Sequence, residues 1–349
     1  SEDAALTCFG QEFNPETYAI AKADMLIKGG NASGMKFGDT LSDDAFSGYE
    51  FDYIISNPPF GIDWKREKAQ VENEAKRGFD GRFGPGLPAI SDGQMLFMLN
   101  GVKKLKEGSG RMAIIQNGSS LFTGDAGSGA SEIRRYVIEG DLVEAIIQLP
   151  TDLFYNTGIS TYIWVLTKGK AMYRSGKVQL IDASKCFVKR RKNIGSKRVD
   201  LDDACIDLIL RAYEKFSNET YEENGLVVES KVFDNSFFGF TKVTVETAQA
   251  DKDGKFILKK GKKQPVKGAS DTEIIPLSED SEAYMKKNVL PYNPLAYIDP
   301  AKDKIGYEVP FTRLFYKFEA PASSDSIFEE IKALEAEETI LMKELFGHA

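Results

Sequence analysis

Residues 51–61 read FDYIISNPPFG, and this stretch decides the fold. Its first half, Phe51–Ser56, is rich in aromatic and β-branched residues and predicts a buried strand. Asn57-Pro58-Pro59 ends the strand, because proline has no backbone N–H for a sheet ladder. A candidate binding loop therefore follows directly after a strand.

The turn after this strand has the polar groups to hold an amine. Two prolines stiffen it and leave the carbonyl groups of Asn57 and Pro58 without local partners. The side-chain oxygen of Asn57 and the carbonyl oxygen of Pro58 can then accept hydrogen bonds from one amino group, and Phe60 offers a flat face for stacking. An exocyclic amine on a planar base fits this arrangement. The alternative is an ordinary proline turn that closes a strand.

Strand-like and helix-like segments alternate around this stretch. Strands are predicted at Ala5–Gly10, Met35–Gly38, Arg111–Gln116, Leu142–Leu149 and Thr161–Thr167, and helices at Pro15–Lys28, Gln94–Leu105 and Glu132–Glu139. Such alternation is typical of a doubly wound α/β sheet, which binds ligands at the carboxyl ends of its strands.

The remaining segments are less regular. Residues 62–91 lose the pattern and are interpreted as a long loop. After Gly169 we expect a helix at Asp202–Phe216, a strand at Thr241–Glu246, a hairpin turn at Asp253-Gly254 and irregular structure over Ser270–Lys304. Ser326–Phe346 is predicted to be a long helix that opens with a capping box of Ser326 and Glu329.

Composition bounds the class of protein. The chain has 349 residues, 42% of them hydrophobic and 28% charged, which suits about two globular domains. One histidine, His348, excludes histidine-based triads and histidine-rich metal sites, so no metal site is expected. The longest apolar runs, such as Tyr162–Leu166, are far short of the roughly 18 residues that a membrane span needs.

Charge and cysteine content restrict how the protein could bind nucleic acid and where in the cell it is expected. The net charge is −8, so binding to nucleic acid would need local basic patches or a partner subunit. The three cysteines share no CxxC spacing and favour a reducing, cytoplasmic location. No basic-then-apolar leader opens the sequence.

Here the sequence resembles a family. Asn-Pro-Pro-Phe after a strand resembles the amino-methyltransferase motif of S-adenosylmethionine-dependent N6-adenine DNA methyltransferases. Further matching segments are FGQEFNPETYAIAKADMLIKG (9–29), FGDTL (37–41), LFYNTGISTYIWVLTKGK (153–170) and IGYEVPFTRLFYKFE (305–319). Together with the terminal helix, these segments are similar to the modification subunit of type I restriction-modification systems.

The resemblance implies roles for single residues. Asn57, Pro58, Pro59 and Phe60 match the catalytic clamp on the target amine. Glu12 matches the acid that binds the cofactor ribose, Asp39 matches the residue that binds the cofactor adenine, and Asn57 would also border the cofactor. Phe154 matches an aromatic residue that stacks on the target base opposite Phe60. From the residues alone, Glu12 could equally be a helix N-terminal acid, Asp39 a turn residue and Phe154 a core aromatic.

The resemblance also implies an activity and partners. It implies transfer of a methyl group from S-adenosyl-L-methionine to N6 of adenine in double-stranded DNA. The expected partners are a specificity subunit and a restriction (nuclease-translocase) subunit. Alternatives are a methyltransferase of a protein glutamine amide or an RNA base, or a non-catalytic assembly module.

One element of the family's pattern has no counterpart. Its glycine-rich cofactor loop lies on the strand before the one that carries the ribose-binding acid, and only eleven residues precede Glu12. The expected fold is therefore a Rossmann-like methyltransferase sheet, incomplete at the N-terminus, followed by an α+β extension and a long helix. The expected domains are 1–170 for the catalytic core, 171–319 for the extension and 320–349 for a coiled-coil-like helix. The run Gly124–Gly129 is interpreted as the cap of a helix.

Two surface features remain. A basic cluster could contact phosphates, although a solvated surface run is the favoured interpretation; it contains Lys185, Lys189, Arg190, Arg191, Lys192, Lys197 and Arg198. The terminal helix has an apolar stripe that suits another helix, formed by Ile327, Ile331, Leu334, Leu341 and Leu345.

Overall fold

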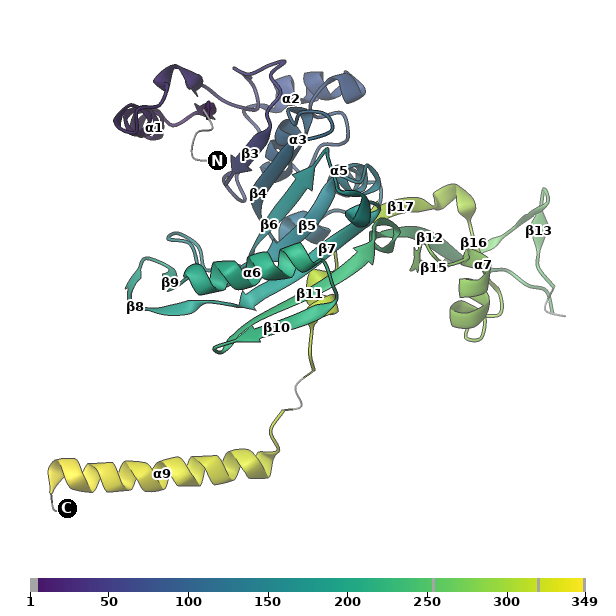
Figure 1. Cartoon of the computed structure of the whole chain (residues 1–349). Coiled ribbons are helices and arrows are strands. Elements are labelled where there is room, and N and C mark those ends of the chain that lie inside the picture. Colours follow the sequence, from purple (N-terminus) through teal and green to yellow (C-terminus); the bar gives the residue numbers. More distant parts are fainter. Residues whose placement is uncertain (1–5, 253–254, 319–320, 348–349) are drawn as a thin grey trace. The chain divides into compact units, whose positions relative to one another are not determined.

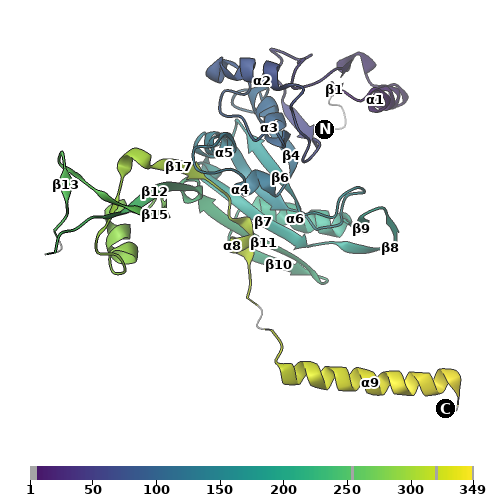
Figure 2. The same cartoon turned by 180° about the vertical axis from the view of Figure 1, so that it is seen from behind.

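A mixed seven-stranded sheet organises the part of the chain up to Phe311 (Figures 1 and 2). The computed structural model describes residues 6–252, 255–318 and 321–347. The strand order is β10-β11-β7-β5-β6-β4-β3. Their bounds are β3 (Tyr53–Ser56), β4 (Arg111–Asn117), β5 (Val143–Gln148), β6 (Thr161–Thr167), β7 (Lys177–Lys185), β10 (Glu219–Glu223) and β11 (Leu226–Asp234). The predicted α/β sheet is confirmed.

Helices cover both faces of this sheet. On one face, α3 (Gln94–Lys103) and α5 (Gly129–Glu139) share a core with Trp64, Val71 and Phe83, beside the short α4 (Ser119–Phe122). On the other face, α6 (Asp203–Lys215) buries Leu208 and Ala212 against β5 and β7. Ser128 caps α5, as the interpretation of Gly124–Gly129 predicted.

β7 was not predicted, although Val178, Leu180 and Ile181 are fully buried in it. The sheet therefore continues to Asp234, beyond residue 170, where the first domain boundary was expected. The chain divides into two compact units after Phe311. Short 3-10 turns lie at Ala32–Gly34, Gly78–Asp80, Met172–Arg174, Asn235–Phe238 and Pro300–Lys302.

A separate parallel pair of strands lies near the start of the chain. It consists of β1 (Gly10–Glu12) and β2 (Met35–Phe37), joined by α1 (Pro15–Ile27). The strand predicted at Ala5–Gly10 thus lies later than expected, and Ala5 is outside the described residues. Phe9 fixes the pair next to the start of β3. Its ring centroid lies within 5.7 Å of the ring centroids of Phe46, Tyr49 and Phe51, and Phe51 stands just before β3.

β3 is an edge strand in the described part of the chain. It pairs with β4 alone, while β1 pairs with β2 alone. The carbonyl of Asp52 accepts a hydrogen bond from Arg111 N (2.9 Å), so the backbone groups of Tyr53 and Ile55, one and three residues on, point away from β4. The side chains of Tyr53 and Ile55 are 73% and 90% exposed. An apolar strand with an open hydrogen-bonding edge is suited to pair with another strand.

The loop predicted over residues 62–91 contains α2 (Lys68–Ala75), so that interpretation was wrong in part. α2 buries one residue, Val71, and such a helix leaves little periodicity in the sequence. The irregular structure predicted over Ser270–Lys304 was also wrong. It contains most of β15 (Pro265–Pro276), α7 (Ser281–Tyr284) with a π-helical turn at Met285–Val289, and β16 (Ala296–Ile298).

A smaller sheet forms around β12 (Gly239–Ala248), which confirms the strand predicted at Thr241–Glu246. β12 pairs with β15, β16 and β17 (Lys304–Tyr307). Arg134 of α5 joins this sheet to the helices that cover the main one, because its Nε donates to the carbonyl of Tyr307 in β17 (2.5 Å) and its Nη2 to that of Thr123 after α4 (2.9 Å). Burial lowers the pKa of Arg134 to about 10.

Two hairpins and two helices complete the described structure. One hairpin is β8 (Val188–Ile194) with β9 (Lys197–Asp200), and the other is β13 (Leu258–Lys259) with β14 (Lys262–Lys263). The turn predicted at Asp253-Gly254 lies outside the described residues.

The helices at the end are α8 (Phe311–Phe315) and α9 (Ser324–Phe346). Ser323 caps α9 by accepting from Ser326 N (3.1 Å), so the capping box predicted at Ser326 and Glu329 was wrong and the helix begins earlier. No described helix combines the length and apolar character needed to cross a membrane.

Candidate active site

Four strands of the main sheet end at the same edge. β3 is parallel to β4, and β5 is parallel to β7; β6 lies antiparallel between β4 and β5. β3, β4, β5 and β7 therefore run in the same direction, and β6 runs in the opposite one. The loops that follow them meet at one edge of the sheet: Asn57–Gly61 after β3, Gly118-Ser119 after β4, Leu149–Ser160 after β5 and the β8–β9 hairpin after β7. We call this the carboxyl edge.

The loop after β3 presents Asn57 to solvent. Pro58 is buried, Asn57 is exposed and Phe60 is half-buried. Gly61 adopts a positive φ of 64°, a backbone conformation that favours glycine, and ends the loop. Within the described part of the chain, the Asn57 side chain has no hydrogen-bond partner, so its oxygen is free to accept from a ligand.

Glu12 and Asp39 lie side by side at the ends of β1 and β2. β1 and β2 are parallel, and Gly38 N donates to the carbonyl of Glu12 (3.1 Å). One carboxylate oxygen of Glu12 accepts from Asn14 N (2.7 Å), and Oδ1 of Asp39 accepts from Leu41 N (2.8 Å). Both side chains are thus held at the ends of their strands by nearby backbone groups.

The segment after Phe60 connects this acidic pair to the loop of Asn57. Arg66 lies 4.6 Å from the ring centroid of Phe13, the neighbour of Glu12. Glu67 is hydrogen-bonded to Asp39; burial and this second carboxyl raise the pKa of Glu67. The chain that leaves the Asn57 loop therefore passes directly beside Glu12 and Asp39.

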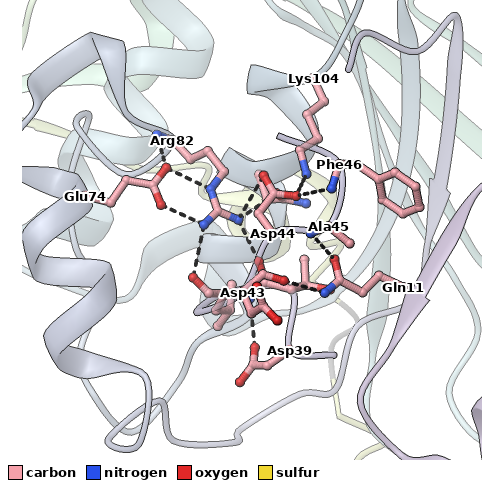
Figure 3. A network of polar contacts seen from close by, with 12 residues as sticks. Gln11, Asp39, Asp43, Asp44, Ala45, Phe46, Glu74, Arg82 and Lys104 are labelled. Atoms are coloured by element: carbon pink, nitrogen blue, oxygen red, sulfur yellow. Dashed lines mark hydrogen bonds and ion pairs between the residues drawn. The ribbon is translucent and has the colours of Figure 1, made fainter. Parts of the chain in front are cut away.

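A buried arginine fixes the turn that carries Asp39 (Figure 3). Arg82, 8% exposed, donates from Nη1 to the carbonyl of Thr40 (2.6 Å) and from Nη2 to that of Leu41 (3.1 Å). Its Nη2 also pairs with Glu74 of α2 (2.6 Å). Burial alone would raise the pKa of Glu74, but the hydrogen bonds and charge of Arg82 outweigh it and hold that pKa below its ordinary value.

Two further contacts in Figure 3 extend this network. Lys104 at the end of α3 pairs with Asp44, and Gln11 Nε2 donates to the carbonyl of Asp43 (2.6 Å). Because Gln11 precedes Glu12, the same turn is tied to β1, to α2 and to α3. We call Arg82, Glu74, Asp44, Lys104 and Gln11 the arginine network.

Phe154 lies in the loop after β5. It is half-buried and forms an isolated bridge with Thr157. β3 and β5 are separated by β4 and β6, so their ends lie about 14 Å apart at the usual spacing of about 4.8 Å between strands. The loop from Leu149 to Ser160 is long enough to cover that distance. The structure thus brings Phe60 and Phe154 to the same edge.

A polar cluster at the end of β4 was missed from the sequence. Gln94, 1% exposed, donates from Nε2 to Asp92 (2.7 Å) and to Asn117 Oδ1 (2.8 Å), and accepts from Asn117 N (3.0 Å). Gly93 N donates to the carbonyl of Ile62, so the cluster also holds the Asn57 loop (3.0 Å). Asn117-Gly118 after a buried strand was the signal that could have found it.

Comparison with known proteins identifies the family of the chain. Residues 1–253 match the model of the N-6 DNA Methylase family. The chain belongs to that family. The part of the chain that matches holds the acidic pair, the Asn57 loop, the Phe154 loop and the β8–β9 hairpin.

Relatives within the family are methylase subunits of type I restriction enzymes. The MjaIX methylase subunit of Methanocaldococcus jannaschii is 29% identical over 192 residues, 54% of this chain and 33% of the relative. The HindI methylase subunit of Haemophilus influenzae is 28% identical over 255 residues, 71% of this chain and 54% of the relative. The chain thus spans about a third to a half of the curated relatives that it matches.

A solved structure is also similar. The type I restriction-modification system methyltransferase subunit from Streptococcus thermophilus matches with a TM-score of 0.55 and 27% identity, covering 66% of this chain and 46% of that one. The resemblance to type I modification subunits that the motifs predicted is confirmed. Within the described residues, no group of three or more His, Cys, Asp and Glu side chains could hold a metal ion.

The arginine network gives a testable prediction. Arg82→Met removes the guanidinium from Glu74 and from the carbonyls of Thr40 and Leu41, and leaves Glu74 only the backbone N–H of residue 82; breaking a buried ion pair in this way costs about 3 kcal/mol. Since 1.4 kcal/mol is a factor of ten, we expect amide exchange at Leu41, Asp43 and Ala45 to become roughly 100-fold faster.

The control is Arg135→Met, because Arg135 is a half-buried residue at the surface of α5 whose ion pair with Glu139 lies far from this turn in the sequence. It should leave exchange at these three amides unchanged. Equal exchange in the wild type and in Arg82→Met would show that the turn of Asp39 does not depend on Arg82.

Proposed function

We propose that this chain is the catalytic part of a modification subunit that transfers a methyl group from S-adenosyl-L-methionine to N6 of adenine in double-stranded DNA. The observation that carries the proposal is the Asn57–Phe60 loop at the carboxyl end of β3, in a chain of the N-6 DNA Methylase family. Because the chain covers only part of its relatives, the complete protein is the unit to which this activity belongs.

The loop would act on the target amine. N6 of adenine is a poor nucleophile because its lone pair is delocalised into the ring. The side-chain oxygen of Asn57 and the carbonyl of Pro58 would accept its two N–H groups and draw the nitrogen toward a tetrahedral form. Phe60 and Phe154 would hold the base between them, and the base must leave the duplex to reach this edge. No covalent enzyme intermediate is needed, because the reaction depends on position and electrostatics.

Glu12 and Asp39 fit the cofactor. A carboxylate at the end of a strand suits ribose hydroxyls, and one next to it suits an adenine amino group. Each of these side chains keeps acceptor capacity beyond the backbone contact that orients it. S-adenosyl-L-methionine would supply the methyl group. The segment Ile62–Glu67 would close the space between the cofactor and the Asn57 loop.

The open edges of β1 and β3 support a further element of the proposal. A strand that pairs with both would satisfy the backbone groups of Tyr53 and Ile55 and would end beside Glu12 and Asn57. We propose that the complete protein supplies this strand together with the glycine-rich loop expected from the family. That loop would hold the methionine end of the cofactor.

α9 is proposed to bind a specificity subunit, and a restriction (nuclease-translocase) subunit would join the same complex. Every described residue of α9 is exposed. Its stripe from Ile327 to Leu345 is widened by Phe328, Met342 and Phe346. Such a face on an otherwise acidic helix suits partner helices more than DNA.

The activity predicts a specific effect of Asn57→Ala in the complete protein. Loss of one acceptor that acts in the transition state should lower kcat for methyl transfer about 100- to 1,000-fold. Cofactor affinity should stay within about threefold, since cofactor binding would depend chiefly on Glu12 and Asp39. Radiolabelled transfer to DNA, with and without the specificity subunit, and calorimetric titration of the cofactor measure the two effects.

Asn73→Ala, on the exposed surface of α2, is the matched control and should retain full activity. RNA and glutamine-containing peptides serve as alternative substrates in the same assay. Preferential methylation of either one would contradict the proposal, and an equal loss of cofactor binding in Asn57→Ala would assign Asn57 to the fold or the cofactor site.

The helix stripe gives a second prediction. Replacing Leu334 and Leu341 with Asp should abolish co-purification of the complete protein with the specificity subunit, because two buried charges would then face the partner. The control places the same charges on the opposite side of α9, at Ala336 and Thr339, and should preserve the complex.

The thermal transition of the free protein separates the two roles that α9 could have. We expect it to be nearly unchanged in both variants. A large drop in the Leu334 and Leu341 variant with partner binding intact would show that α9 packs within its own subunit.

A further inference from the structure

We infer that the β8–β9 hairpin is an arm that binds DNA phosphates next to the target base and is fixed to the loop of Phe154. This inference rests on the proposed function, because it names the surface on which the DNA backbone would lie. It concerns residues 185–200, which no part of the proposed reaction uses.

The topology places the arm at the carboxyl edge. β8 follows β7, whose end lies at the same edge as the Asn57 and Phe154 loops. Both views show the hairpin standing out from the sheet at this edge (Figures 1 and 2). A duplex that delivers a base to this edge would therefore have its backbone within reach of the hairpin.

The hairpin is attached to the Phe154 loop by its backbone. Ser196 N donates to the carbonyl of Tyr155 (2.9 Å), and Arg198 N donates to that of Asp152 (2.8 Å). Lys197 Nζ lies 5.3 Å from the ring centroid of Tyr155. The turn between β8 and β9 packs directly against the Phe154 loop, because a Cβ at Gly195 would lie 2.6 Å from the carbonyl oxygen of Tyr155. Movement of the hairpin would thus move the neighbours of Phe154.

The charges of the hairpin are mostly unpaired. Residues 185–200 contain seven basic side chains and one acid, Asp200, in a chain with a net charge of −8. Asp200 pairs with Arg190 and Lys197. The other five are exposed, and the described residues provide no ion pair for them: Lys185, Lys189, Arg191, Lys192 and Arg198. Crowding these charges costs free energy unless a polyanion lies against them.

DNA phosphates are the polyanion that this position favours. Lysine and arginine on an extended hairpin can reach phosphates several ångströms apart, and each contact releases condensed counterions. Such contacts carry no sequence information. The arm would therefore raise affinity for any duplex and hold the target nucleotide beside Phe154, while a partner subunit would choose the sequence.

The test uses the complete protein with its specificity subunit. The variant replaces Lys189, Arg191 and Lys192 with Gln, and its matched control replaces Lys259, Lys262 and Lys267 with Gln. All six side chains are exposed, and the control lies on or beside the β13–β14 hairpin, away from the carboxyl edge. DNA binding is measured by fluorescence anisotropy between 50 and 300 mM salt on one duplex that carries the recognition site, a range in which about three lost contacts are resolved.

The arm variant should bind roughly 10- to 100-fold more weakly at about 150 mM salt, and the slope of log affinity against log salt should fall in magnitude by about 2 to 3. The DNA affinity of the control variant should stay within about twofold of the wild type, and both variants should keep the cofactor affinity of the wild type. An unchanged slope in the arm variant would overturn the inference, as would an equal loss in the control.

Two other outcomes would also overturn it. Loss of the specificity subunit from the arm variant would make the hairpin a protein interface, and tighter binding of RNA than of DNA would make it an RNA surface. Failure of the inference differs from failure of the proposed function. If the function fails, the wild type itself transfers no methyl group to DNA. If the wild type methylates DNA but the arm variant keeps the salt slope of the wild type, the inference about the hairpin alone is rejected.

Discussion

The parallel direction of β3, β4, β5 and β7 is the constraint on which the rest of the site depends. Backbone hydrogen bonds fix it, and it brings the Asn57 loop, the Phe154 loop and the β8–β9 hairpin to one edge. Reversing any of these strands would send its loop to the opposite edge. The chemistry proposed for Asn57 is thus a property of the sheet as much as of the loop.

The segment from residue 62 to 94 then sets the positions of the side chains at that edge. Arg82 and Glu74 fix the turn of Asp39. Gln94 bonds to Asn117 at the end of β4, and its neighbour Gly93 bonds to Ile62 directly after the Asn57 loop. Arg82 and Gln94 are buried, and a buried polar group without a partner costs more than an exposed one. The segment therefore supports the side chains of the site from behind, through Arg82 and Gln94.

The sequence predicted the elements whose signal is local. β4 alternates buried and half-buried residues, and Asn57-Pro58-Pro59 marks the end of β3 by chemistry alone. β15 was missed because its residues are mostly exposed and polar, and α2 because Val71 is its one buried residue. The contacts of Arg82 with Thr40 and of Ser196 with Tyr155 join residues about forty apart, and no sequence pattern marks such pairs. The residues of the proposed site were thus found by motif, and their supports only by structure.

The central claim is that β3 lies inside a larger sheet in the complete protein, with a strand between it and β1 that completes the cofactor site. Residue-resolved amide exchange at Tyr53 and Ile55 tests this most directly, with Ile54 and Ser56, which face β4, as internal references. The account predicts that all four amides are protected in the complete protein, and that Tyr53 and Ile55 exchange rapidly in residues 1–349 alone. Rapid exchange of Tyr53 and Ile55 in both would contradict it.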